Sequence, residues 1–159
     1  MEIPQEIFSH LVSATEEVFE TMVFKQLTAA PVLPGDAARP KSNVVATVPF
    51  AGHRRGLVAF HASLPGAKAI AGAMLGMEPA SINGEMPDAI GEVANMIAGT
   101  FRNKLAAIEP ASAIAVPTVT IGSDFSTRYV SEVRRVLCPF DMDGTAGDPV
   151  YVELILTGD

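Results

Sequence analysis

The chain has a single cysteine, Cys138, among its 159 residues, and it has no tryptophan. One cysteine cannot form an internal disulfide bond, which excludes a disulfide-stapled secreted domain and fits a reducing cytoplasm. Its expected role is that of a small apolar residue in a strand. With no tryptophan and only two tyrosines, the sequence also lacks side chains on which nucleic-acid bases could stack.

Charged residues are scarce, at 18% of the chain against about 25% in an average soluble protein. Acids outnumber bases by 18 to 11, which gives a net charge of −7. Binding to a nucleic-acid backbone needs clustered lysine and arginine, so this class of partner is excluded. The scarcity of charge and a mean hydropathy of +0.30 predict apolar surface that a second subunit covers, hence a homodimer.

The sequence has no apolar run long enough to cross a bilayer, because its most apolar window is interrupted by His61, Pro65 and Lys68. The first residues lack the basic start and apolar run of a signal peptide. We therefore expect a soluble cytoplasmic protein with no membrane insertion. The length predicts one domain, residues 1–159.

Motifs of self-contained catalysis are also missing, among them G-x-S-x-G, G-x-x-x-x-G-K and G-x-G-x-x-G. The three histidines show no ligand spacing with cysteine or carboxylates, so no metal site is predicted. Asp141 and Asp143 resemble the start of a calcium loop, but Val152 stands where such a loop needs glutamate. A hairpin turn explains this segment better. Arg134 and Arg135 are expected to be solvated charges at a sheet edge.

The order of predicted elements indicates an α+β fold with a largely antiparallel sheet. Helices are predicted over residues 4–27, 64–75 and 87–105, and β-rich runs over 44–50, 54–62, 114–121, 128–140 and 149–157. The first two strands form a hairpin, and residues 28–42, which carry three prolines and a glycine, are expected to be a loop.

Helix followed by hairpin occurs twice, and the two long helices share a faint repeat at an offset of 75 residues. The segment ATEEVFETM, residues 14–22, matches AIGEVANMI, residues 89–97, at Ala14/Ala89, Glu17/Glu92 and Val18/Val93. A duplicated unit with approximate two-fold symmetry would explain the repeat, and so would chance similarity of two amphipathic helices. Where the second helix has Asn95 the first has Glu20, so one working site is expected, on the second helix.

The helix over residues 87–105 has two contrasting faces. Its apolar stripe consists of Ile90, Val93, Ile97, Phe101, Leu105 and Ile108, and its opposite stripe of Asp88, Glu92, Asn95, Gly99 and Arg102. The side chains of Glu92 and Asn95 should therefore project side by side from the outer surface.

The surroundings of Asn95 are unusually bare. Three of its four helical neighbours, Gly91, Ala98 and Gly99, have almost no side chain, although glycine inside a helix costs roughly 1 kcal/mol relative to alanine. Two interpretations stay open. The small residues could let a partner's backbone approach Glu92 and Asn95, or they could let the helix pack tightly on its own sheet.

The segment DAIGEVANMIAG, residues 88–99, resembles the signature helix of the bacterial chemotaxis phosphatase family of CheC, CheX and FliY, and is most similar to CheX. The residues that carry the resemblance are Asp88, Gly91, Glu92, Asn95 and Gly99. It implies a fold of two helix-plus-strands units with pseudo-two-fold symmetry, dimerisation, and removal of phosphate from the aspartate of a CheY-like receiver domain. Glu17 and Glu20 depart from a second active motif in the first helix.

The resemblance also implies roles for single residues. Asn95 would orient the hydrolytic water and Glu92 would pair with a lysine of the receiver, which would also hold the Mg²⁺; this chain needs no cofactor of its own. The contact surface for the partner would include Asp88, Gly91, Ala98, Gly99 and Arg102. A neutral carboxamide suits the first role, because a carboxylate would repel the anionic phosphoryl group. A non-catalytic module that docks a receiver through the same helix is the alternative.

Overall fold

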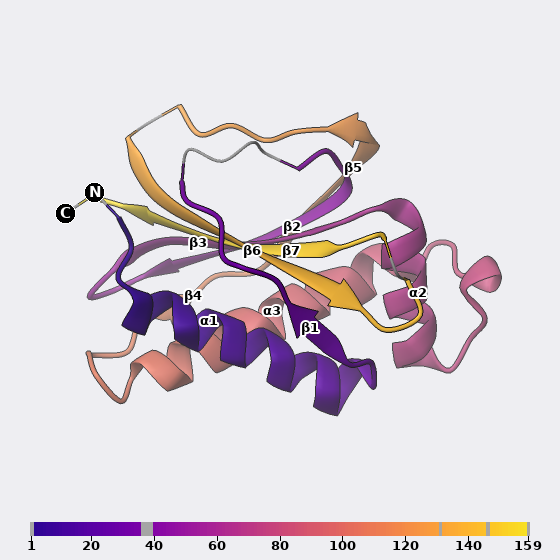
Figure 1. Ribbon diagram of the computed structural model, residues 1–159, viewed down its shortest axis with the longest axis horizontal. Helices are drawn as coiled ribbons and strands as arrows, with labels where there is room; N and C mark the ends of the chain where they lie inside the picture. Colours follow the sequence, from indigo (N-terminus) through magenta and orange to yellow (C-terminus); the bar gives the residue numbers. More distant parts are fainter. Residues whose placement is uncertain (1, 36–39, 131, 146, 159) are drawn as a thin grey trace.

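A curled antiparallel sheet with helices packed on one face forms the framework of the protein (Figure 1). The computed structural model describes residues 2–35, 40–130, 132–145 and 147–158. The helical elements are α1 (Gln5–Val18), the π-helical turn η1 (Phe19–Val23), α2 (Leu64–Leu75), the 3₁₀ turn η2 (Pro79–Ser81) and α3 (Met86–Leu105). The strands are β1 (Leu27–Ala29), β2 (Ser42–Ala51), β3 (Arg55–Ala62), β4 (Ala113–Ile114), β5 (Thr118–Phe125), β6 (Val133–Met142) and β7 (Val150–Thr157). The predicted α+β class is confirmed.

The strand order is symmetric with respect to the two halves of the chain. It is β1-β6-β7-β3-β2-β4, with every pair antiparallel and β5 added on β2. One unit is α1, β1, β2 and β3, and the other is α3, β4, β6 and β7; β3 and β7 pair at the centre. Exchanging the units reproduces the order, so the predicted pseudo-two-fold symmetry is confirmed.

The main core lies between the sheet and the helices. Alternate residues of β3 and β7, such as Val58 and Phe60, or Val152 and Leu154, belong to this core together with the buried residues of α1 and α3. Figure 1 shows both helices on one side of the sheet. The other face of the sheet carries a small apolar cluster of Val45, Ala59 and Ile155, against which the segment after β5 packs. Because α1 and α3 turn their apolar stripes toward the sheet, their outer faces remain at the surface.

The predicted first helix is wrong in its last third. Regular α-helix ends at Val18, a π-helical turn follows, and Phe24 takes a left-handed conformation with φ 61° before β1 begins. The extra residue in the π turn rotates the helical pattern, so Met22, expected on the apolar face, is 46% exposed. Part of the predicted loop is strand β1, which forms through long-range pairing with β6.

The predicted strands of the second half are present with shifted limits. The run 114–121 is two strands, β4 and β5, interrupted around Pro117. The run 128–140 begins later, at Val133. Ile108 lies beyond the end of α3 and is 50% exposed, so its place in the apolar stripe was wrong.

Two smaller predictions are confirmed in the hairpin of β6 and β7. Cys138 is buried in β6, and burial raises the pKa of its thiol to about 12, as expected for an inert apolar strand residue. Asp143 and Asp148 lie in the turn that joins the two strands, closed by the Thr145 amide bonding to Met142 O at 3.1 Å.

A buried polar network crosses four strands on the face of the sheet opposite the helices. Ser42 Oγ lies 3.2 Å from His61 Nδ1, His61 Nε2 lies 3.1 Å from Glu153 Oε1, and Arg135 Nε donates to Glu153 Oε2. All four residues are buried, so the expectation that Arg135 is a solvated edge charge was wrong. The Arg135 guanidinium compensates the negative charge of the fully buried Glu153 carboxylate beside it.

None of the helices within the described residues combines the length and the hydropathy that crossing a membrane requires.

Candidate functional site

The outer face of α3 places the two central polar residues of the motif at the surface. The helix begins at Met86 with proline in its first turn. The carboxylate of Asp88, in the same turn, interacts favourably with the positive end of the helix dipole. Glu92 is exposed and Asn95 is partly exposed. Across the described part of the chain, neither of the two side chains has a hydrogen bond or an ion pair. Both groups are therefore available to a molecule that approaches from solvent.

Gly91 faces its own chain. A Cβ built on it would lie 3.3 Å from Val119 Cγ2 and 3.7 Å from Pro117 Cγ, so the start of β5 and the residue just before it cover this position. The packing interpretation of the bare helix accounts for Gly91. Pro117 and Val119 thus lie against α3 at Gly91, four residues before Asn95, and sequence reasoning missed them; the signal was a proline inside a β-rich run.

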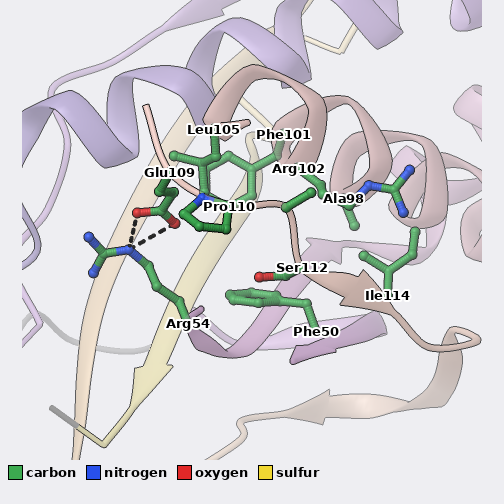
Figure 2. A pocket seen from close by; sticks show the side chains of 11 residues that line it. Phe50, Arg54, Ala98, Phe101, Arg102, Leu105, Glu109, Pro110, Ser112 and Ile114 are labelled. Carbon is green, nitrogen blue, oxygen red and sulfur yellow. Dashed lines mark hydrogen bonds and ion pairs between the residues drawn. The ribbon is translucent and has the colours of Figure 1, made fainter. Parts of the chain in front are cut away.

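Ala98 and Gly99 also differ from each other in their surroundings. Ala98 is buried and lines a pocket with Phe50 and Ile114, which lie across from it in Figure 2. Gly99 is partly exposed, and a Cβ there would make only an ordinary contact, 3.9 Å from Ile114 Cδ1. Of the small residues around Asn95, Gly99 leaves the bare surface and the other two serve packing.

The pocket beside α3 is apolar and too small for a cofactor. Its cavity volume is about 10 Å³, about what one water molecule needs. At its rim Arg54 Nε lies 2.7 and 3.0 Å from the two carboxylate oxygens of Glu109, which ties the β2–β3 turn to the segment after α3 (Figure 2). Arg102 also lines the pocket, and its guanidinium points away from that ion pair.

The equivalent surface of α1 has different chemistry. Glu17 Oε1 is 3.4 Å from Lys104 Nζ of α3, so its charge is already paired. By the 75-residue offset, Glu20, which is exposed, corresponds to Asn95, and Phe24, which is 75% exposed just after the π turn, corresponds to Gly99. The first helix therefore has neither a neutral amide nor a bare turn at the matching positions.

Within the described residues, no three histidine, cysteine or acidic side chains come close enough together to hold a metal ion.

A model of one protein family, chemotaxis phosphatase CheX, matches residues 44–141, a range that includes Glu92 and Asn95. The chain belongs to the CheX family of chemotaxis phosphatases. The match begins in β2 and ends in β6, so it contains α3 and most of the sheet. None of the curated protein sequences matches the chain.

Solved structures share the CheX fold over almost the full chain. The chemotaxis protein CheX from Desulfovibrio desulfuricans is 28% identical with a TM-score of 0.85, covering 96% of this chain and 99% of that one. A chain of the CheX–CheY–BeF₃–Mg²⁺ complex from Borrelia burgdorferi is 17% identical with a TM-score of 0.81, covering 96% and 98%. FliY from Thermotoga maritima is 16% identical with a TM-score of 0.70, covering 96% and 91%. The last two show the fold alone.

Proposed function

We propose that this chain hydrolyses the aspartyl phosphate of a CheY-like receiver domain. The observation that carries the proposal is the pair of Glu92 and Asn95, which reach the surface of α3 side by side and have no hydrogen-bond or ion-pair partner among the described residues. Membership of a chemotaxis phosphatase family supports the reaction type. The Borrelia structure, in which CheX is in complex with CheY and Mg²⁺, supports the kind of partner.

The proposed mechanism depends on positioning. An acyl phosphate is already activated, so hydrolysis mainly needs a water molecule held in line with the phosphorus. The Asn95 carboxamide can donate to and accept from that water while staying neutral beside the phosphoryl group. Glu92, three residues earlier on the same face, pairs with a lysine of the receiver and fixes the approach. Mg²⁺, held by the receiver, would offset the charge on the phosphoryl oxygens.

The direct test measures the lifetime of the phosphoryl group. A purified CheY-like receiver is phosphorylated in the presence of Mg²⁺, and its decay is followed with and without a small molar fraction of this chain. We expect the decay rate to rise by about tenfold or more, with one molecule of the chain turning over many receivers. Saturable binding of the receiver with no acceleration would instead establish the scaffold alternative.

We also propose that the chain forms a homodimer through the free edge of β5. Within the described residues β5 pairs with β2 alone, and Ile121 on it is 51% exposed. An edge strand of eight residues that carries a single charged residue, Asp124, is a template for pairing with another chain.

Ile121→Glu is therefore expected to convert the dimer to a monomer in sedimentation velocity at a fixed protein concentration, because paired strands would face two buried carboxylates. Val130→Glu is the matched control, since Val130 is fully exposed outside any strand. An Ile121→Glu protein that sediments like the wild type contradicts this interface.

A further inference from the structure

Arg102 lies on the same line of the α3 surface as Asn95, two turns further along. Seven residues separate them, about 10.5 Å along the helix axis and only about 20° around it. Long side chains on a helix lean toward its N-terminus, and the turn between the two residues is formed by Ala98 and Gly99. The guanidinium accordingly extends past Ala98, above Ile114, and points away from the Arg54–Glu109 pair (Figure 2).

The charge of Arg102 has no acidic partner within the described part of the chain, although the chain has an excess of acids. Two neighbouring cations do have one: Arg54 bonds Glu109 at 2.7 Å, and Lys104 lies 3.4 Å from Glu17. The side-chain contact of Arg102 is a hydrogen bond from Nη2 to Asn103 Oδ1 at the long distance of 3.5 Å. A guanidinium has five donors in a planar fork that matches a carboxylate, so most of its capacity is unused.

We propose that Arg102 is a second charged anchor for the receiver, pairing with a carboxylate on the rim of the receiver's phosphorylation site. This inference rests on the proposed function. The outer face of α3 then presents an acid, an amide and a cation in succession along the helix axis, with Glu92 and Arg102 ten residues or about 15 Å apart along it. This order is directional: it requires a basic group on one side of the bound phosphoryl group and an acidic group on the other.

The chemistry of the partner supplies that acid. Mg²⁺ is bound through oxygen ligands, chiefly one or two carboxylates together with phosphate oxygens. A receiver that holds Mg²⁺ beside an aspartyl phosphate must therefore gather acidic groups there, in addition to the lysine proposed to meet Glu92. Arg102 would attract this acidic rim and would exclude the reversed orientation, in which it would face the lysine. It would act on docking and leave the attack of water to Asn95.

The test separates KM from kcat in steady-state dephosphorylation, with the full chain, phosphorylated CheY-like receiver and Mg²⁺. Arg102→Glu is expected to raise KM by about tenfold or more and to leave kcat within about twofold, because a like charge now faces the acidic rim. Arg102→Lys keeps the charge and should stay within about threefold of the wild-type KM. Added salt should raise the wild-type KM more than that of Arg102→Glu.

Control variants keep the outcomes distinct. Arg128→Glu makes the same charge change at an exposed position in the segment after β5 and should leave KM unchanged. Unchanged thermal unfolding of Arg102→Glu, together with recovery in Arg102→Lys, excludes a merely structural effect. If Asn95→Ala abolishes turnover while Arg102→Glu keeps the wild-type KM, or lowers kcat alone, the docking role is wrong and the phosphatase stands. If Asn95→Ala has the wild-type kcat, the proposed function itself is wrong.

Discussion

Asn95→Ala is expected to lower the maximal rate of receiver dephosphorylation by about 100- to 1,000-fold, the usual cost of removing one preorganised polar group at a reaction centre. The side chain is partly exposed and has no partner within the described residues, so its removal should cost little stability. KM should stay within about threefold, because Glu92 still makes its docking contact. The measurement is kcat from phosphate release at saturating phosphorylated receiver.

Two further variants test whether Asn95 acts by orienting the water or only by the size of its side chain. Asn95→Asp preserves shape but places a carboxylate beside the phosphoryl anion, so it should be as inactive as Asn95→Ala. Asn103→Ala, at an exposed asparagine on the same helix, should keep the wild-type kcat. An Asn95→Asp protein with wild-type turnover would show that the neutral amide does not orient the water.

Glu153→Gln is expected to lower the free energy of unfolding by about 3–5 kcal/mol, because it leaves the buried Arg135 guanidinium without its counter-ion. The glutamate also accepts from His61, so one substitution disturbs contacts to two other strands, β3 and β6. Urea unfolding followed by circular dichroism gives the difference. Glu132→Gln, an exposed acid just before β6, is the control and should change stability by less than about 0.5 kcal/mol.

The same carboxylate should contribute to acid denaturation. Burial alone would raise the pKa of Glu153, but the hydrogen bonds and positive charges of His61 and Arg135 outweigh it and hold the pKa below its ordinary value of 4.5. The unfolded chain therefore binds this proton first, so the stabilisation is complete above the unfolded pKa and is lost as pH falls through the folded one. Glu153→Gln should lack this part of the pH dependence. Identical slopes of stability against pH below 4.5 in both proteins would contradict the assignment.

Local periodicity was enough to predict that Glu92 and Asn95 lie on the outer face of α3, since a helix of regular geometry fixes which residues share a face. It failed for Met22, because a π turn changes the period and nothing in the side chains marks it. Gly91 stayed ambiguous because what covers it depends on the positions of Val119 and Pro117, which are distant in the sequence.

The buried polar network was beyond sequence reasoning for a different reason. His61, Arg135 and Glu153 are far apart in the chain and meet only because β3 and β6 both flank β7. Predicting that contact requires the order and register of the strands, which depend on the whole sheet. An arginine in a strand is expected to be solvated as long as the strands beside it are unknown.

The exchange of edge strands between the two halves has a consequence for how such a protein can change. β1 of the first half lies beside β6 of the second, and β4 of the second lies beside β2 of the first. Each half thus supplies an edge strand to the other half, and removing either half would leave unpaired backbone groups on the strand that remains. The outward sides of α1 and α3 take no part in this strand exchange, so the residues there can differ between the two halves, as Asn95 and Glu20 do, without opening the sheet.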